Sequence, residues 1–240
     1  MTNSATPIVI LGGGLAGLYC ALKLAPLPVT LIAPNPVGSS GASYWAQGGI
    51  AAAVEEGDTP EKHAFDTIAA GAGLVEAEIA LGMAQEARKR IDELLELGAP
   101  FDRTKHGLFL PSQEAAHSHR RIIRVKGDSA GRAIMETLKT KLRTTPSISL
   151  VEGATAYKIT KNSNSSLSVY CSTSEGQTIE YRCACLVLAT GGVGHLYKIT
   201  TNPCDSCGAG LAMAAQAGAL IADAEFVQFH PTAIDIKDRK

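Results

Sequence analysis

The sequence has almost no net charge and no long apolar run, and both absences exclude classes of protein. A formal net charge of −1 over 240 residues gives no support for nucleic acid or an anionic membrane as a partner. No apolar run approaches the roughly 18 residues of a transmembrane helix. The N-terminus lacks the basic segment of a signal peptide. We therefore expect a cytoplasmic protein that binds neither nucleic acid nor a membrane.

The cysteines lack a metal or disulfide pattern. Only one pair, Cys204 and Cys207, has the CxxC spacing, and no second CxxC or HxxxH stands at zinc spacing. In a cytoplasmic protein the six scattered cysteines are expected to be reduced and mostly buried thiols. We expect no metal. A composition of 45% hydrophobic and 19% charged residues is instead that of a globular protein with a substantial core.

The first thirty or so residues carry the strongest motif. Ile8 to Leu11 has the length and branched side chains of a buried parallel strand. It runs into Gly12-x-Gly14-x-x-Gly17, then into a helix expected over Leu18 to Leu24, and Val29 to Ile32 supplies a second strand. The glycines allow a tight turn, close approach of the backbone to a pyrophosphate, and close packing of helix and strand. This βαβ unit predicts a dinucleotide site at a helix N-terminus.

One expected part of that site is missing. An acidic residue about 20 positions after the glycines normally binds a ribose hydroxyl. The second strand instead ends Leu31-Ile32-Ala33-Pro34-Asn35 and carries no carboxylate. A nicotinamide cofactor held through a ribose carboxylate is therefore disfavoured, and Asn35 or backbone groups would have to serve the ribose.

Two later segments also carry candidate functional residues. Pro36 to Ile50 is dominated by small and hydroxyl residues but contains Tyr44 and Trp45, which favours a loop covering a cofactor over a flexible linker. Leu108 to Arg124 gathers histidines and arginines around the single Glu114. Spacing alone leaves two interpretations open, an anion-binding edge and an exposed basic turn before a strand.

The remaining chain predicts an α/β fold with an inserted sheet. Helices are expected over Glu61–Ala70 and Glu76–Leu97. A third helix is expected to follow Asp128-Ser-Ala-Gly-Arg132 and to end at about Arg143. Ile148–Glu152 is expected to be a strand. A polar antiparallel β-meander follows at about 154–182 and interrupts the doubly wound pattern, which Ala184–Ala189 and the glycine turn at 190–194 resume.

Six motifs, taken in order, resemble the succinate dehydrogenase/fumarate reductase flavoprotein family. They are Gly12-x-Gly14-x-x-Gly17, Ala46-Gln-Gly-Gly-Ile50, His117-Ser-His-Arg-Arg121, Ala189-Thr-Gly-Gly192, Thr201-Asn-Pro203 and Phe229-His-Pro-Thr232. The resemblance covers essentially the whole chain. It implies a Rossmann-like FAD-binding fold over residues 1–240, with the β-meander as an insertion.

Two positions select a branch of that family. The respiratory members attach flavin covalently through a histidine five residues before the glutamine of Ala-Gln-Gly-Gly, and this position is Ala42 here, so the resemblance implies non-covalent FAD. Members that oxidise L-aspartate carry a glutamate three residues before the His-Ser-His motif, and Glu114 matches it. The resemblance is therefore greatest to the L-aspartate oxidase branch.

That branch implies a reaction and its partners. L-aspartate loses its α-hydrogen as hydride to flavin and becomes iminoaspartate, and dioxygen or fumarate then accepts the electrons. The reaction opens NAD biosynthesis through quinolinate, which implies quinolinate synthase as a partner. Alternatives are a soluble fumarate reductase or succinate dehydrogenase-type flavoprotein, and a non-catalytic FAD-binding module.

The resemblance also implies which residues form the site. Glu114 and His230 are the implied catalytic residues, and they bind substrate together with Thr232 and Gln47; on its own, His230 would be interpreted as a structural histidine. The implied cofactor-binding residues are Gly12, Gly13, Gly14, Leu15, Ala16, Gly17, Ser40, Ala42, Ser43, Tyr44, Trp45, Ala46, Gln47, Gly48, Gly49, Ala154, Thr190, Gly191 and Ala209.

The chain departs from the family in three respects, two at the cofactor site and one at the C-terminus. The family often has Gly-Asp-Gly where this chain has Gly208-Ala209-Gly210, and a lysine near the end of the second strand is replaced around Pro34. The family's capping domain, catalytic arginine and C-terminal helical domain follow the Phe-His-Pro-Thr motif, whereas this chain ends eight residues after Thr232. We therefore expect those parts to be absent from this chain, and the chain alone to be inactive.

Overall fold

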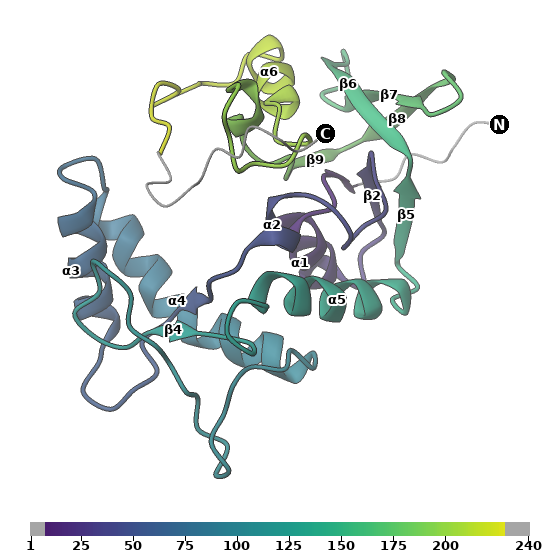
Figure 1. Ribbon diagram of the computed structural model, residues 1–240. Helices are drawn as coiled ribbons and strands as arrows, with labels where there is room; N and C mark the ends of the chain where they lie inside the picture. The colour runs from purple at the N-terminus through teal and green to yellow at the C-terminus, as the bar shows by residue number, and fades with distance from the viewer. Residues whose placement is uncertain (1–7, 229–240) are drawn as a thin grey trace. The chain divides into compact units, whose positions relative to one another are not determined.

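A computed structural model describes residues 8–228 (Figure 1). The chain divides into two compact units, which are described separately. Unit 1 contains the described residues up to Tyr44 and those from Leu138 onward, and unit 2 runs from Trp45 to Thr137. The assignment of residues 1–240 to one FAD-binding domain stays a prediction.

Unit 1 is built on a four-stranded parallel sheet of order β5-β2-β1-β9. The strands are β1 (Ile8–Leu11), β2 (Val29–Ala33), β5 (Ile148–Glu152) and β9 (Cys185–Leu188). β1 lies in the interior of the sheet, with Ile8 opposite Val29 of β2 and Cys185 of β9. β2 is buried along its whole length, as expected for a parallel strand. All four predicted strands are confirmed.

Helix α1 (Leu15–Leu24) follows β1 and starts three residues earlier than the sequence indicated. Gly14 is the N-cap, with an extended backbone at φ −83° and ψ −176°, so the last glycine of the motif already lies inside the helix. Gly17, Leu18 and Ala21 form its buried face. The small Gly17 belongs to that face because the helix lies close to the preceding loop.

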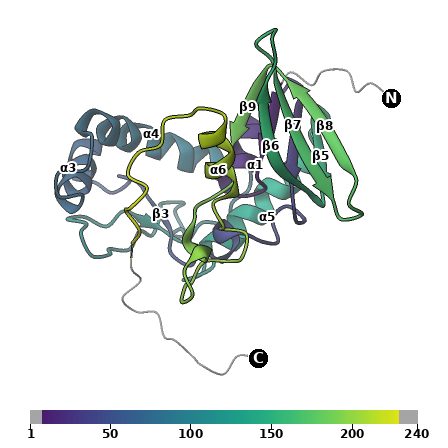
Figure 2. The same ribbon diagram turned by 90° about the horizontal axis from the view of Figure 1, so that it is seen from above.

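The predicted β-meander is present in unit 1. Strands β6 (Ala154–Lys161), β7 (Leu167–Thr173) and β8 (Thr178–Cys183) pair antiparallel in the order β6-β7-β8 (Figure 2). Their buried residues, such as Val169 and Cys171, share one hydrophobic cluster with Val9 and Leu11 of β1. Helix α6 (Ala209–Gln216) packs on β6 and contributes Met213 to the cluster. The short helix η1 (Gly194–Leu196) follows β9.

Unit 2 contains a pair of helices, α3 (Pro60–Ala70) and α4 (Ala77–Glu96). Thr59 caps α3 by accepting a hydrogen bond from the Lys62 N–H, and Pro60 occupies the first turn. Gly98, at φ +101°, follows the end of α4, where a left-handed residue commonly terminates a helix. Both helices therefore lie within one residue of their predicted ends.

Four further elements complete the described chain. In unit 2, β3 (Ile50–Ala51) and β4 (Ile122–Ile123) form a two-stranded antiparallel ladder. The short helix α2 (Ala42–Trp45) lies in the predicted cofactor loop and was not expected from sequence. Helix α5 (Ala130–Arg143) contains the point at which the two units divide. Within residues 8–228, no helix combines the length and the apolar character needed to cross a bilayer.

Candidate functional site

The glycine motif forms a turn at the carboxyl end of β1 that tolerates no side chain at two positions. A Cβ atom on Gly12, which has φ +119°, would lie 2.1 Å from the carbonyl oxygen of Ala189. A Cβ atom on Gly17 would lie 2.0 Å from the carbonyl oxygen of Gly12. The motif therefore packs the loop, the helix and the end of β9 into close contact, as the dinucleotide interpretation requires.

The N-terminus of α1 is suited to a negative group. Gly14 provides no side-chain cap, and the first turn of α1 has no acidic residue, so the positive end of the helix dipole is not neutralised locally. The Leu15 N–H donates to the Ser43 hydroxyl at 3.1 Å. The structure thus brings one predicted residue of the cofactor loop to the predicted helix terminus.

A second glycine turn lies beside the first. Thr190 and Gly191 follow β9, and the Ala189 N–H donates to the Leu11 carbonyl at 2.8 Å. A Cβ atom on Gly210 would lie 1.8 Å from Thr190 Oγ1, so the start of α6 also lies against this turn. Of the predicted cofactor residues, Gly12 to Gly17, Ser43, Thr190, Gly191 and Ala209 are therefore gathered in unit 1.

The other predicted cofactor-binding residues of unit 1 lie in different elements. Ala154 begins β6 and is 2% exposed, within the hydrophobic cluster, so only its backbone is available to a ligand. Ser40 precedes α2, while Ala42 and Tyr44 lie in it. The individual roles of these residues in binding a cofactor stay predictions.

Asn35 has a partner that the sequence did not indicate. Its side-chain Nδ2 donates to Asp205 Oδ1 at 3.0 Å. The two residues are 170 positions apart, so no local pattern could have related them. A carboxylate therefore lies at the end of β2 after all.

In unit 2, the Gln47-Gly48-Gly49 segment leads into β3. A Cβ atom on Gly49 would lie 2.2 Å from the Ile123 carbonyl oxygen, which explains the need for glycine beside β4. Ala46 accepts a hydrogen bond from the Gly131 N–H at 3.0 Å. Gln47 is exposed. This segment is therefore fixed by its backbone, with the Gln47 side chain accessible.

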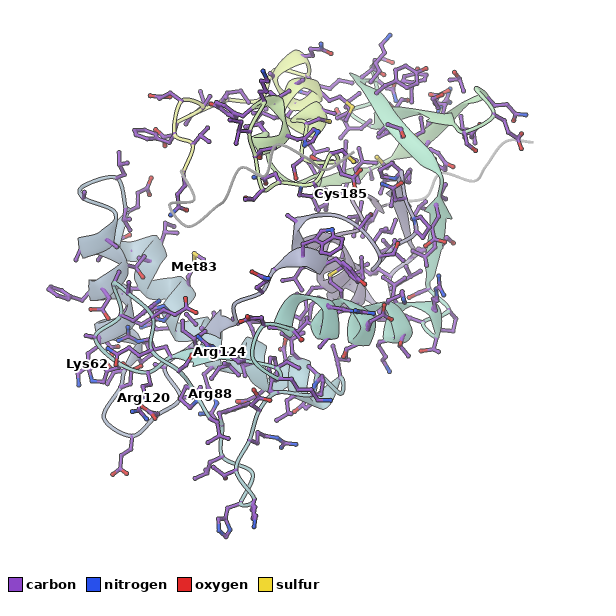
Figure 3. All side chains as sticks on the ribbon, in the orientation of Figure 1. Lys62, Met83, Arg88, Arg120, Arg124 and Cys185 are labelled. Atoms are coloured by element: carbon purple, nitrogen blue, oxygen red, sulfur yellow. The ribbon has the colours of Figure 1, made fainter. Side chains whose placement is uncertain are left out.

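Glu114 lies beside this segment within unit 2. Its Oε1 lies 3.9 Å from the position of a Cβ atom on Gly48 and accepts a hydrogen bond from Arg124 Nη2 at 3.3 Å. The side chains of Arg124, labelled in Figure 3, and Glu114 are 33% and 46% exposed. From the sequence, Arg124 was one of several cationic residues near Glu114, and residue spacing did not identify it as the partner of Glu114.

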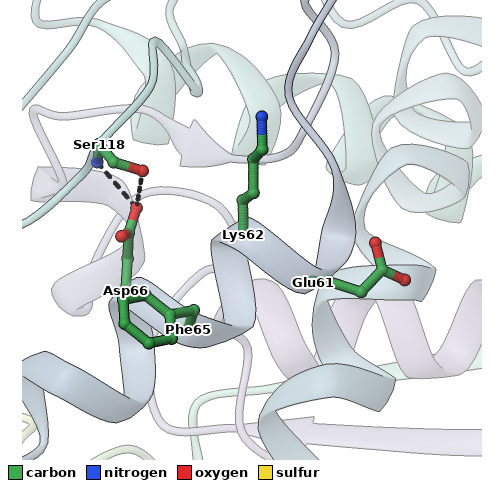
Figure 4. A pocket seen from close by; sticks show the side chains of 5 residues that line it. All are labelled: Glu61, Lys62, Phe65, Asp66 and Ser118. Atoms are coloured by element: carbon green, nitrogen blue, oxygen red, sulfur yellow. Dashed lines mark hydrogen bonds between the residues drawn. The ribbon is translucent and has the colours of Figure 1, made fainter.

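Arg121 is neither an exposed basic residue nor a free anion binder. Its side chain is fully buried and donates to both oxygens of Asp58, at 2.8 Å from Nε and 2.9 Å from Nη2. Nη1 donates to Asp66 and, at 3.2 Å, to His117 Nδ1. Ser118 also donates to Asp66, from its backbone at 2.7 Å and its hydroxyl at 2.8 Å (Figure 4). For Arg121, both interpretations from the sequence are therefore wrong.

Arg121, Asp58, Asp66, His117 and His63 form a cluster. Burial and contacts within it shift the pKa values of Asp66, Arg121 and His63. Burial by itself would raise the pKa of Asp66, but hydrogen bonds from Ser118 and Arg121 outweigh it and hold this pKa well below its usual range. Burial opposes the charge of Arg121, and the two aspartates nevertheless raise its pKa. Burial, followed by the charges of Arg121 and His117, lowers the pKa of His63. These shifts favour the charged forms of Asp66 and Arg121 and the neutral imidazole of His63.

Two predicted substrate residues, His230 and Thr232, lie outside the residues that the structure describes. Their roles stay predictions.

Comparisons with known proteins agree with this geometry. The chain matches the family described as FAD binding domain over residues 7–240. It is 47% identical over 231 residues to the L-aspartate oxidase of Caulobacter vibrioides, covering 95% of this chain and 45% of the relative. For the L-aspartate oxidase of Mesorhizobium japonicum the identity is 45%, covering 96% of this chain and 45% of the relative.

Solved structures show the same relationship. The FrdA chain of a variant of E. coli quinol fumarate reductase superposes with a TM-score of 0.91 at 26% identity, covering 98% of this chain and 40% of that chain. Mycobacterium smegmatis Sdh1 in complex with UQ1 gives 0.83 at 28% identity, covering 89% and 38%. The resemblance inferred from the six motifs and the predicted fold class are confirmed. The chain spans about half the length of the curated relatives it matches.

Proposed function

This chain belongs to the FAD binding domain family, and from that premise we propose that the full-length protein that carries it oxidises L-aspartate to iminoaspartate. In this reaction the Cα–H bond breaks and two electrons leave with the hydrogen. The nitrogen loses a proton, and a C=N bond forms. Dioxygen or fumarate is the proposed final electron acceptor. The similarity to curated L-aspartate oxidases supports this choice of substrate.

The residues of unit 1 fit a non-covalently bound FAD. The turn at Gly12 and Gly17 leaves no room for side chains, and the uncapped N-terminus of α1 is suited to a pyrophosphate. Ser43 and the turn at Thr190 and Gly191 would contribute further polar groups. Bound FAD supplies the two-electron acceptor that the amino-acid side chains lack. Ala42 takes the position of the histidine that attaches flavin covalently in respiratory members of the family, which supports non-covalent binding.

Glu114 carries the proposal that the substrate has an amino group. Its carboxylate is accessible and lies beside Gly48, where it could accept hydrogen bonds from a substrate ammonium. Arg124 compensates its charge and would be available for a substrate carboxylate once the ammonium binds Glu114. Gln47, His230 and Thr232 are proposed to complete the contacts with the substrate.

The proposal has a direct test. The full-length protein, purified with its flavin, is mixed with L-aspartate without oxygen, and loss of the oxidised flavin absorbance is followed. We expect reduction by L-aspartate and not by succinate. Glu114→Gln should reduce the rate at low substrate by about 10-fold or more, through loss of a charged hydrogen bond of about 1.5–3 kcal/mol, while flavin content stays unchanged.

Two outcomes would contradict the proposal. Reduction by succinate but not L-aspartate would favour the alternative of a fumarate reductase or succinate dehydrogenase-type flavoprotein, which the fold similarity to quinol fumarate reductase supports. A flavin that neither substrate reduces would favour a non-catalytic FAD-binding module. Arg120→Gln, on the same segment but without a role in the proposal, is the matched control for Glu114→Gln.

We also propose a setting for the reaction. Iminoaspartate hydrolyses readily, so direct use by quinolinate synthase, in the first steps of NAD biosynthesis, would protect the product. A cytoplasmic location is part of the proposal. The six cysteines are free thiols, which fits a reducing compartment.

A further inference from the structure

The end of β2 lacks the carboxylate that usually binds ribose in this kind of fold. In dinucleotide-binding folds, a carboxylate at this position binds a ribose hydroxyl, but the chain continues from Ala33 into Pro34 and Asn35. An amide accepts a hydroxyl hydrogen bond more weakly than a carboxylate does. If this chain binds an adenosine ribose in the usual way, the carboxylate must come from elsewhere.

Asp205 brings a carboxylate to this position. Asn35 Nδ2 donates to Asp205 Oδ1 at 3.0 Å, and both residues are partly buried. Within residues 8–228, the other donor to Asp205 is the Cys204 thiol, which approaches the same oxygen at 3.8 Å. Asp205 Oδ2 therefore keeps its capacity to accept a hydrogen bond from a ligand hydroxyl.

The segment that carries Asp205 is anchored to the second glycine turn. The neighbouring Ser206 is buried, and its carbonyl accepts a hydrogen bond from the His195 N–H at 3.0 Å. The Gly208 N–H donates to the Gly192 carbonyl at 3.1 Å. These contacts hold Asp205 at the carboxyl edge of the parallel sheet, where ligands of this fold bind.

Sheet order adds a second argument. β1 lies between β2 and β9, Asn35 follows β2, and the segment containing Asp205 follows β9. The Asn35–Asp205 hydrogen bond therefore joins the two sides of the glycine turn that follows β1. A dinucleotide whose pyrophosphate lies at this turn would place its adenosine ribose beside β2, within the region that Asp205 enters.

Glu152 is the other carboxylate near this edge, and it is already engaged. It ends β5, on the far side of β2 from β1. Its Oε1 accepts a hydrogen bond from the Val37 N–H at 2.7 Å and lies 3.8 Å from Arg143 Nη2. Glu152 therefore stabilises the turn after β2 and is the weaker candidate.

We propose that Asp205 supplies the carboxylate that binds the adenosine ribose of FAD, with Asn35 as its positioning residue. The inference rests on the FAD binding of the proposed function and deepens it. It assigns to a loop far along the chain a role that this fold usually gives to the end of the second strand.

The test measures ligand affinity. Apoprotein prepared by removing flavin is titrated with FAD, and ADP and 2′,3′-dideoxy-ADP, which lacks both ribose hydroxyls, compete for the site. We expect wild-type protein to prefer ADP over its dideoxy analogue by about 10-fold or more. Asp205→Asn should weaken FAD binding by about 10- to 100-fold, as expected for a hydrogen bond to a charged group, and should abolish the preference for ADP.

Three variants complete the design. The exchange Asn35→Asp with Asp205→Asn returns a carboxylate to the end of β2 and keeps an amide opposite it, so the preference for ADP should return. Glu175→Gln, on the exposed β7–β8 turn, controls for loss of one negative charge. Glu152→Gln tests the competing carboxylate, and we expect the ADP preference to persist in it.

The ratio of the affinity for ADP to the affinity for 2′,3′-dideoxy-ADP is measured within each variant. A general loss of folding would weaken both affinities and therefore cannot imitate the expected result. An unchanged ratio in Asp205→Asn, tighter FAD binding in that variant, or loss of the ratio in Glu152→Gln would overturn the inference. Wild-type protein that binds FAD without distinguishing the two analogues would also overturn it. Failure of wild-type protein to bind any FAD would instead refute the proposed function, and the inference with it.

Discussion

Replacing Arg121 by alanine should strongly destabilise unit 2. The side chain is fully buried, and its hydrogen bonds to Asp58 and Asp66 leave these carboxylates paired in a region with little water; their side chains are 0% and 10% exposed. Removal of one partner from a buried ion pair typically costs about 3–5 kcal/mol, because a charge stays buried without compensation. We expect Arg121→Ala to lower the free energy of unfolding by about this amount.

Urea denaturation followed by far-ultraviolet circular dichroism measures this change, because unit 2 contains the long helix α4. If the free energy of unfolding falls by about 2 kcal/mol per molar urea, a loss of about 3–5 kcal/mol in that free energy lowers the urea concentration at the unfolding midpoint by about 1.5–2.5 M. Arg88→Ala is the matched control. Arg88 pairs with Asp92 on the surface of α4, with side-chain exposures of 51% and 44%, and such pairs contribute about 0.2–1 kcal/mol.

The pH dependence supplies an independent check. The pKa of Asp66 is lowered in the folded protein from an ordinary value of 3.8, so its ionised form stabilises the fold above that value. This contribution is lost as the pH falls toward the folded pKa. The difference between wild type and Arg121→Ala should therefore be largest near neutral pH and shrink below about pH 4. A midpoint change no larger than that of Arg88→Ala, or a difference that stays constant on acidification, would refute the reasoning.

Two further predictions concern unit 1. Gly12→Ala should greatly reduce both the melting temperature and the flavin content, because its Cβ would lie 2.1 Å from the Ala189 carbonyl oxygen. Gly57, the control, also has a positive φ, but a Cβ there would meet no atom within 4 Å, so Gly57→Ala should show only the smaller backbone effect. Equal effects of the two changes would contradict the steric argument. Burial raises the pKa of both Cys171 and Cys183 to about 11, so at pH 8 these thiols should react with a disulfide reagent only after unfolding. Fast reaction is expected of the exposed thiols, Cys185, Cys204 and Cys207, and fast labelling of Cys171 would contradict the buried placement of β7.

Local sequence patterns were sufficient for much of the fold. The strand Ile8–Leu11 was predicted with its observed bounds, because an apolar, β-branched run followed by glycines has few alternative conformations. The caps at Thr59 and Gly98 placed the ends of α3 and α4 within one residue. The start of α1 was misplaced, since Gly17 is a poor helix former and yet lies inside the helix, where close packing on the Gly12 carbonyl requires it.

The candidate site was only partly accessible from sequence. The glycine motif, the Ala-Gln-Gly-Gly segment and Glu114 were identified by residue type and order. The charges around Glu114 could not be assigned, because spacing does not distinguish Arg124, which pairs with Glu114, from Arg121, which is buried with Asp58 and Asp66.

The sequence by itself therefore determined most of the longer helices and strands, the parallel sheet and the class of ligand, since these depend on periodicity and on residues close together in the chain. Only the tertiary structure decided which charges neutralise one another. It showed that Asp58 and Asp66 bind an arginine more than fifty positions away, and that Asp205 reaches Asn35 across 170 positions. The physical reason is that ion pairs and hydrogen bonds depend on distance in space, which chain folding sets and local pattern does not record.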